Sequence, residues 1–253
     1  MNYIIYDLEF NQKNNSSKDD DNNAIETELN NSSSMPFEII QIGALKLNEN
    51  FQTISTFNTL IKPTVHKSIH PFVENLTKIT DYMVASCKDF VHVYEDFLQF
   101  IGDEEIILCI WGVTDIKELI RNVKFYKLST SHISKYIDIQ KYASKYLKAP
   151  EKSRIGLRNA IELLSIPIEG EFHDAFNDAY YTAEVFKLIH NDNIKPMIYT
   201  PAPPRRISKP KEKIDTISLI NQFETMYNRE MTEDEKSLIK LAYMMGKTRQ
   251  FIL

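Results

Sequence analysis

Cysteine is scarce in this chain, and the sequence also lacks a long apolar run and an excess of positive charge. Only Cys87 and Cys109 occur among 253 residues, too few for a disulfide scaffold or a zinc finger. No apolar run approaches the roughly 20 residues that cross a bilayer. The net charge of −5 argues against a protein that coats nucleic acid through bulk positive charge. It does not exclude an enzyme that binds the end of a nucleic-acid chain through local contacts.

The remaining composition is that of an ordinary globular protein in reducing surroundings. The chain is 43% hydrophobic and 26% charged, which fits one sizeable domain with an attachment. Its first ten residues carry acids, without the basic region or small-residue cleavage site of a signal peptide. We therefore expect a soluble, cytoplasmic protein with no membrane partner.

The apolar pattern predicts an α/β fold. YIIYDLEF, EIIQIGALKL and FQTISTFNTLI are rich in β-branched and aromatic residues, so they predict three consecutive antiparallel strands. Helical spacing follows at about 71–102, and EIILCIW predicts a strand buried on both faces. Helices then alternate with one weak strand near 136–139. Three strands followed by this alternation predict a mixed sheet with helices on both faces.

Segments of biased composition divide the chain. Residues 12–35 are rich in Asn, Ser and Asp and predict a mobile polar insertion within a domain that covers residues 1–200. Residues 201–215 are rich in proline and basic residues and predict an extended linker. Beyond the linker, residues 216–253 predict a small helical hairpin, whose second helix opens with Thr232 and Glu235 at capping-box spacing.

Four acids stand where a carboxylate is costly or well placed for a ligand. Asp7 and Glu9 are two residues apart in a predicted strand, so both side chains point to one face. Asp178 lies on a helical stripe that should face the sheet, where an unpaired acid is rare. Asp115 follows the buried strand, in the first turn of a helix that Thr114 would cap. An acid there also simply complements the helix dipole.

Carboxylates of this kind favour Mg²⁺ or Mn²⁺ over zinc, because hard cations prefer oxygen ligands. Two such ions about 4 Å apart can hold a phosphodiester while one activates a water and the other stabilises the leaving oxygen. We place His173 in the loop before the helix of Asp178, over the site, where a histidine can take the proton of that water. His66 and His70 are interpreted as structural, and both cysteines as small core residues.

The acids and His173 stand in motifs that resemble a known family. YDLEF resembles the first motif of the DEDD 3′-to-5′ exonucleases, WGVTD the second and HDAFND the third, in the His-x-Ala-x-x-Asp form of the DEDDh branch. The resemblance extends from residue 1 to about 190, and the ordered set of three motifs is more specific than any single Asp-x-Glu. The Trp-Gly before Asp115 is further similar to the subgroup containing KapD and the histone-mRNA 3′ exonucleases.

The resemblance implies a ribonuclease-H-like fold with a mixed five-stranded sheet flanked by helices. It implies hydrolysis of single-stranded RNA or DNA from the 3′ end to nucleoside 5′-monophosphates with two Mg²⁺ or Mn²⁺ ions, and the subgroup favours RNA. Asp7, Glu9 and Asp178 would bind the first metal, Asp7 and Asp115 would serve the second, and His173 would be the general base.

The same resemblance implies substrate contacts from Glu9, Phe10, Asn11 and His173. Asn11 departs from the family pattern, because relatives commonly carry threonine in its place. An amide can still donate and accept hydrogen bonds, so we expect contact with altered geometry.

Several alternatives stay open at this point. A DNA-trimming or proofreading-type exonuclease would carry the same motifs, and a fold that has lost turnover would serve as a nucleic-acid or regulatory binding module. The presence of all five motif residues weighs against lost turnover. The polar insertion is either a substrate-contacting flap or a solvent loop. The basic linker either steers nucleic acid or only connects, and the hairpin either docks a protein partner or packs on its own domain.

Overall fold

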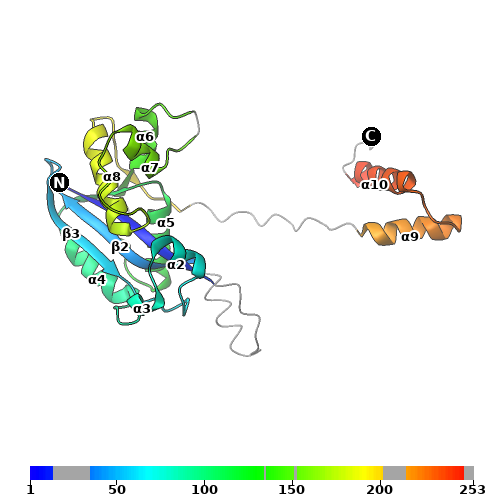
Figure 1. Cartoon of the computed structure of the whole chain (residues 1–253), viewed down its shortest axis with the longest axis horizontal. Coiled ribbons are helices and arrows are strands. Elements are labelled where there is room, and N and C mark those ends of the chain that lie inside the picture. The colour runs from blue at the N-terminus through cyan, green and yellow to red at the C-terminus, as the bar shows by residue number, and fades with distance from the viewer. Residues whose placement is uncertain (14–34, 134, 151–152, 202–214, 248–253) are drawn as a thin grey trace. The chain divides into compact units, whose positions relative to one another are not determined.

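The computed structural model describes residues 1–13, 35–133, 135–150, 153–201 and 215–247 (Figure 1). The chain divides into two compact units, Met1–Pro201 and Ala202–Leu253. The predicted polar insertion and basic linker lie almost entirely outside the described residues.

A mixed sheet of six strands, in the order β3-β2-β1-β4-β5-β6, forms the centre of the first unit. The predicted antiparallel arrangement of β1 (Asn2–Gln12), β2 (Phe37–Leu47) and β3 (Thr53–Leu60) is confirmed. β4 (Ile106–Ile110) runs parallel to β1, and β5 (Lys135–Asp138) runs parallel to β4.

The predicted fold class is confirmed, but the prediction of five strands was wrong by one. The two-residue strand β6 (Met197–Ile198) pairs antiparallel with β5. It belongs to the segment that follows the last helix of the unit, which returns to the open edge of the sheet. A strand this short has no sequence period by which it could be predicted.

Helices cover both faces of this sheet (Figure 1). The described residues of the first unit form α2 (Pro71–Thr77), α3 (Asp81–Val84), α4 (Phe90–Ile101), α5 (Thr114–Phe125), α6 (Ile139–Tyr146), α7 (Leu157–Leu163) and α8 (Ala175–Ile189). One core lies between the sheet and α4 and α5, and the other lies between the sheet and α6, α7 and α8. Strand β1 is therefore buried on both sides.

Side chains of β1 alternate between these two cores. Ile4 and Tyr6 pack with α4 and α5, whereas Tyr3 and Ile5 pack with α6, α7 and α8. Because the period of a strand is two, Asp7 and Glu9 continue the second face. A fully buried apolar side chain would contribute about 1.5–3 kcal/mol at such a position. Fold stability therefore gives no reason for two acids here.

α8 lies very close to the strand that pairs with β1. Gly43 of β2 is the register partner of Asp7, and a Cβ at position 43 would lie only 2.2 Å from the backbone of Ala175 and Phe176. Only glycine permits this approach of helix and strand. The contact brings the first turn of α8, and with it Asp178, next to the acids of β1.

The second unit contains a pair of helices, α9 (Thr216–Tyr227) and α10 (Glu233–Lys247). The predicted capping box is present, because the Thr232 hydroxyl accepts from the Glu235 N–H and the Glu235 carboxylate accepts from the Thr232 N–H. Met231 is the buried residue of this unit within its described part. Among all described helices, none combines the length and the apolar character that a membrane span requires.

Candidate active site

The four predicted acids form one cluster of like charges. Burial raises the pKa of Asp7 well above its usual range, and the charges of Asp115, Asp178 and Glu9 raise this pKa further. Burial, together with neighbouring carboxylates, raises the pKa of Glu9 and that of Asp115 to about 8. Burial also raises the pKa of Asp178 to about 6. Among the described residues, the charge of Arg158 lowers the pKa of Asp178 but does not offset the effect of burial.

Topology explains why these acids meet. β1 and β4 are parallel neighbours, so the end of β1 that carries Asp7 and Glu9 lies beside the end of β4 that leads to Asp115. Asp178 reaches the same place from α8, across the Gly43 contact. The chemistry therefore lies outside the carboxyl ends of parallel strands, where ligand sites of α/β sheets gather.

The donor set fits a divalent cation. Oδ1 of Asp178 is buried and has no hydrogen-bond partner among the described residues, while Oδ2 accepts the backbone N–H of His173 at 3.1 Å. Ligand atoms of Glu9, His173 and Asp178 lie within 4.8 Å of one another. An unpaired buried carboxylate oxygen within a group of acids is costly unless a cation satisfies it. Carboxylate oxygens are the ligands that Mg²⁺ and Mn²⁺ prefer.

His173 lies in the loop before α8, as predicted, and its backbone is strained. Its φ of +64° is in the left-handed region, which costs a residue other than glycine about 1–3 kcal/mol. The hydrogen bond from its N–H to Asp178 holds this conformation. The histidine side chain is exposed, so it is accessible to substrate and water.

The predicted helix cap beside Asp115 was wrong. Val113, not Thr114, occupies the N-cap position of α5, and no side chain caps this helix. The chain turns at Gly112, with φ of +88°, and the helix begins at Thr114, one residue earlier than the capping pattern predicts. Asp115 still lies in the first turn, with a side chain that is almost entirely buried.

Asn11 does not fit a side-chain contact with substrate. Its side chain is fully buried; Nδ2 donates to the carbonyl oxygens of Ser68 at 2.9 Å and His66 at 3.4 Å, and Oδ1 accepts the N–H of His70 at 2.9 Å. The Asn11 amide therefore makes its hydrogen bonds with the backbone of the loop formed by residues 66–70. We correct the prediction and assign Asn11 the role of positioning this loop, which leads into α2.

Phe10 and the two nearby histidines also have structural contacts. The Phe10 side chain lies on the opposite face of β1 from Glu9, with its ring 6.2 Å from that of Phe37, so only its backbone borders the acid cluster. His66 is buried, with Nε2 3.2 Å from the Met35 carbonyl oxygen, and His70 caps α2. The interpretation of both histidines as structural agrees with these contacts.

We expect Asn11→Ala to weaken substrate binding through the loop 66–70. Without the amide, the partly buried carbonyl of Ser68 and N–H of His70 lose their partners, which costs up to about 1–3 kcal/mol for each group that stays unsatisfied. KM for a single-stranded oligonucleotide should rise about 10-fold while kcat stays within about 3-fold, since 1.4 kcal/mol is a factor of ten. Steady-state kinetics would check this. A fall in kcat with unchanged KM would instead place Asn11 at the chemistry.

A groove of about 490 Å³ opens beside His173. Its lining includes Leu76, Met83 and Phe172, together with Gln41 and Lys78. Lys78 holds a left-handed backbone, with φ of +63°. The lining also includes the acids Glu171 and Asp174, so its apolar side chains and Lys78 are the parts that suit the bases and backbone of a single nucleic-acid strand. Sequence patterns gave no signal for Lys78 or Gln41.

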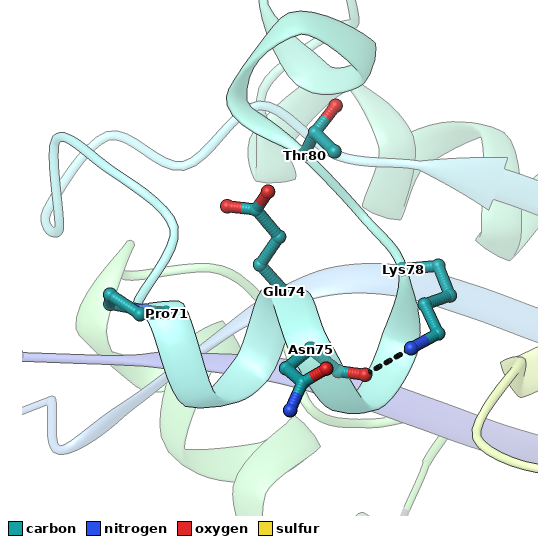
Figure 2. A pocket seen from close by; sticks show the side chains of 5 residues that line it. All are labelled: Pro71, Glu74, Asn75, Lys78 and Thr80. Atoms are coloured by element: carbon teal, nitrogen blue, oxygen red, sulfur yellow. Dashed lines mark hydrogen bonds between the residues drawn. The ribbon is translucent and has the colours of Figure 1, made fainter.

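A second hollow, of about 430 Å³, also has Lys78 in its lining. Figure 2 shows its lining residues Pro71, Glu74, Asn75, Lys78 and Thr80, and the Lys78 Nζ donates to the Asn75 carbonyl oxygen at 2.6 Å. The lysine side chain thus folds back over the end of α2 and borders both hollows.

Comparison with known families agrees with this site. Residues 4–186 match the exonuclease family RNase_T. The chain belongs to this family. The match includes all four acids of the cluster and His173, so the predicted membership among the DEDDh 3′-5′ exonucleases is confirmed.

The exonuclease is similar to two curated bacterial proteins. It is 24% identical over 189 residues to the probable 3′-5′ exonuclease KapD of Bacillus subtilis. The aligned region covers 73% of this chain and 86% of KapD. It is 26% identical over 175 residues to the PolC-type DNA polymerase III of Clostridium perfringens. That match covers 67% of this chain but only 11% of the polymerase.

A solved structure confirms the fold of the exonuclease. The nuclease domain of 3′hExo, a DEDDh family member determined with bound rAMP, superposes with a TM-score of 0.63 at 20% identity. The superposition covers 79% of this chain and 97% of that domain.

We expect the metal-free exonuclease to become less stable as pH rises from about 4 to about 8. The acids of the cluster keep their protons to higher pH in the folded state than in the unfolded chain. The folded state therefore binds more protons over this interval, and the free energy of unfolding falls with pH. Melting temperatures in EDTA would measure the slope.

Asp115→Asn isolates the contribution of the cluster, because it removes one of the titrating carboxylates. The slope should be shallower in this variant than in the wild type. Mn²⁺ should restore the melting temperature of the wild type, most strongly at high pH, because the ionised carboxylates bind it. Equal slopes in both proteins would contradict the assignment.

Proposed function

We propose that this chain is a metal-dependent exonuclease that shortens single-stranded nucleic acid from the 3′ end, with RNA preferred to DNA, and releases nucleoside 5′-monophosphates. The observation that carries the proposal is the unpaired Asp178 oxygen within a cluster of four acids, beside an exposed histidine and an open groove. The family membership of the chain agrees with this chemistry.

The side chains of the cluster have distinct roles in the proposed reaction. Asp7, Glu9, Asp115 and Asp178 would hold two Mg²⁺ or Mn²⁺ ions, which supply electrostatic stabilisation to the reacting phosphate. His173 accepts the proton of the attacking water, since it is exposed at the groove and fixed through its backbone to Asp178. Glu9 and His173 border the position of the terminal nucleotide, together with the backbone of Phe10.

The groove and the relatives support a single-stranded substrate. Leu76 and Met83 offer exposed apolar surface against which bases can pack, and Lys78 offers a charge for the backbone. The rAMP bound to 3′hExo and the Trp-Gly before Asp115 favour RNA. The similarity to a DNA polymerase supports the alternative, a DNA-directed trimming or proofreading-type exonuclease.

RNA and DNA strands of one sequence, each labelled at the 3′ end, test the proposed function. We expect release of the labelled mononucleotide only with Mg²⁺ or Mn²⁺, and faster from RNA. Asp7→Ala and His173→Ala should each reduce the rate, the latter by about 10²–10⁴-fold, as is typical for a lost general base. Faster release from DNA would support the alternative. Absence of any metal-dependent product would reject the enzyme and leave a binding module.

Deletion of residues 205–253 should weaken binding without abolishing hydrolysis. The deleted part carries Arg205, Arg206, Lys209, Lys211 and Lys213, whose charges we propose to attract the nucleic-acid backbone. All motif residues lie in the first compact unit. KM should rise about 3- to 10-fold, with a weaker salt dependence, while kcat is retained. Loss of turnover by a truncated protein that is still folded would contradict this prediction.

A protein partner for the helical hairpin is a second role of the same region. Met226, Leu238 and Leu241 are exposed there. We propose that such a partner would bind through these apolar side chains, independently of the hydrolysis itself.

A further inference from the structure

Gln41 stands on β2 directly opposite Glu9. The two residues are Cα partners in the antiparallel register, so their side chains lie on the same face of the sheet. The Gln41 side chain is 3% exposed, and the next partner pair on this face is Asp7 with Gly43. Gln41 and Gly43, the partners of the two acids of β1, therefore both contact the first turn of α8.

The amide of Gln41 bonds to the beginning of α8 with both of its ends. Its Oε1 accepts the N–H of Ala175 at 3.2 Å, and its Nε2 donates to Oδ2 of Asp174 at 2.9 Å. Nε2 also donates to Oδ1 of Asn58 at 3.0 Å. Ala175 is the first residue of the helix, so its N–H has no partner within the helix.

Asp174 transmits this contact to the catalytic side chains. It is the N-cap of α8, and its Oδ1 accepts the N–H of Asn177 at 3.0 Å. Its carbonyl oxygen accepts the N–H of Asp178 at 2.9 Å. His173 is the preceding residue, held in its left-handed conformation by Asp178. A shift of Asp174 would therefore move the proposed base and one proposed metal ligand together.

We propose that Gln41 is a positioning residue for the active site. It fixes the start of α8 against β2, and so sets the distance from Asp178 and His173 to the acids of β1. The consequence for catalysis rests on the proposed function, whereas the consequence for the geometry of α8 does not. A residue that only stabilised the fold would change the melting temperature but not the metal affinity or kcat of the folded protein.

The sharpest test exchanges the amide of Gln41 with the carboxylate of Asp174. Gln41→Glu places a carboxylate against Asp174, and Asp174→Asn removes the acceptor for the glutamine amide. In the double variant the introduced asparagine amide donates to the introduced carboxylate, which also accepts from the N–H of Ala175. The double variant thus restores the bond between positions 41 and 174 with donor and acceptor exchanged and keeps the bond from Ala175, while the Asn58 amide must turn so that its Nδ2 donates to the new carboxylate. Gln41→Leu removes the contact altogether, and Gln99→Leu, at an exposed glutamine of α4, is the matched control.

Three measurements follow these variants: Mn²⁺ affinity by calorimetry, kcat and KM on an oligonucleotide, and amide hydrogen exchange of residues 175–178 without metal. We expect Gln41→Leu and Gln41→Glu to lose about 10- to 100-fold in Mn²⁺ affinity and in kcat, as residues that support metal ligands typically do. KM should stay within about 3-fold, and exchange at the start of α8 should accelerate. The double variant should recover to within about 3-fold of the wild type, and Gln99→Leu should resemble it.

Wild-type Mn²⁺ affinity, kcat and amide exchange in the folded single variants would overturn the inference. So would a double variant that recovers none of the three. If Gln41→Leu does not fold, the comparison of Gln41→Glu with the double variant decides. If the wild-type protein hydrolyses neither RNA nor DNA, the proposed function fails, and metal affinity and amide exchange still decide the role of Gln41.

Discussion

Asp178→Asn should abolish hydrolysis and, in the absence of metal, make the protein more stable at neutral pH. The two effects have one cause, because Asp178 is a carboxylate placed among other carboxylates with one oxygen unpaired. Such a charge destabilises the metal-free folded protein and is favourable only when a cation is bound.

The loss of activity should be large. Metal ions contribute several kcal/mol of charge stabilisation at a transition state, and 1.36 kcal/mol is a factor of ten, so we expect a fall of about 10³-fold or more. The asparagine oxygen can still accept the N–H of His173, so the loop before α8 should keep its conformation. The variant would then lose hydrolytic activity because the metal ligand is missing, and not because the fold has changed.

The gain in stability follows from the pKa of Asp178, which burial raises to about 6. At neutral pH the wild-type carboxylate is ionised at a cost, and the neutral amide avoids that cost. We expect about 1–3 kcal/mol of stabilisation in EDTA, because one pKa unit corresponds to 1.36 kcal/mol. With saturating Mn²⁺ the order should reverse, since the wild type gains binding energy and the variant gains less.

Thermal unfolding with EDTA and with Mn²⁺, together with rates on a labelled oligonucleotide, would check both halves. Asp103→Asn, at an exposed acid of the same unit, is a control that should change neither quantity. A variant that retains more than a tenth of the activity, or that is less stable than the wild type in EDTA, would reject the role given to Asp178.

Among the glycines of the first unit, Gly43 should be the one at which an added methyl group, as in Gly43→Ala, does the most damage. The added Cβ would meet the backbone of Ala175 and Phe176 at 2.2 Å, and backbone atoms cannot rotate away as a side chain can. α8 must move outward, which should cost about 1–3 kcal/mol or more of folding free energy.

Activity should fall by more than the loss of stability explains. Asp178 and His173 move with the helix, and a misplacement of about 1 Å can cost 100-fold in rate. Rates measured well below the melting temperature separate this effect from unfolding. Gly156→Ala is the matched control, since a Cβ there meets nothing within 4 Å, and it should leave the rate unchanged. Equal rates for the two variants would show that α8 tolerates displacement.

Local patterns predicted the elements that carry the site. Alternation in YIIYDLEF placed Asp7 and Glu9 on one face, and the helical stripe around Asp178 placed that acid toward the sheet. The capping box at Thr232 followed from side chains that bond within three residues. Such features depend on neighbours in the chain, so they are visible in it.

Asn11 shows where this reasoning ends. The family resemblance placed it with Glu9 at the substrate, because relatives commonly carry threonine in its place. In the fold its amide is occupied by a loop that lies 55 to 59 residues further along the chain. The partners of a buried amide are set by which segment covers it, and no local pattern contains that information.

The sequence by itself determined the composition of this site: four carboxylates and a histidine, on strand and helix ends that an α/β sheet brings together. Only the tertiary structure decided how close they come, through Gly43 and Gln41 on β2, which contact α8 more than 130 residues later. Charge and period are properties of single side chains and their neighbours. Distance between two elements is a property of the packing between them, and packing exists only in the folded chain.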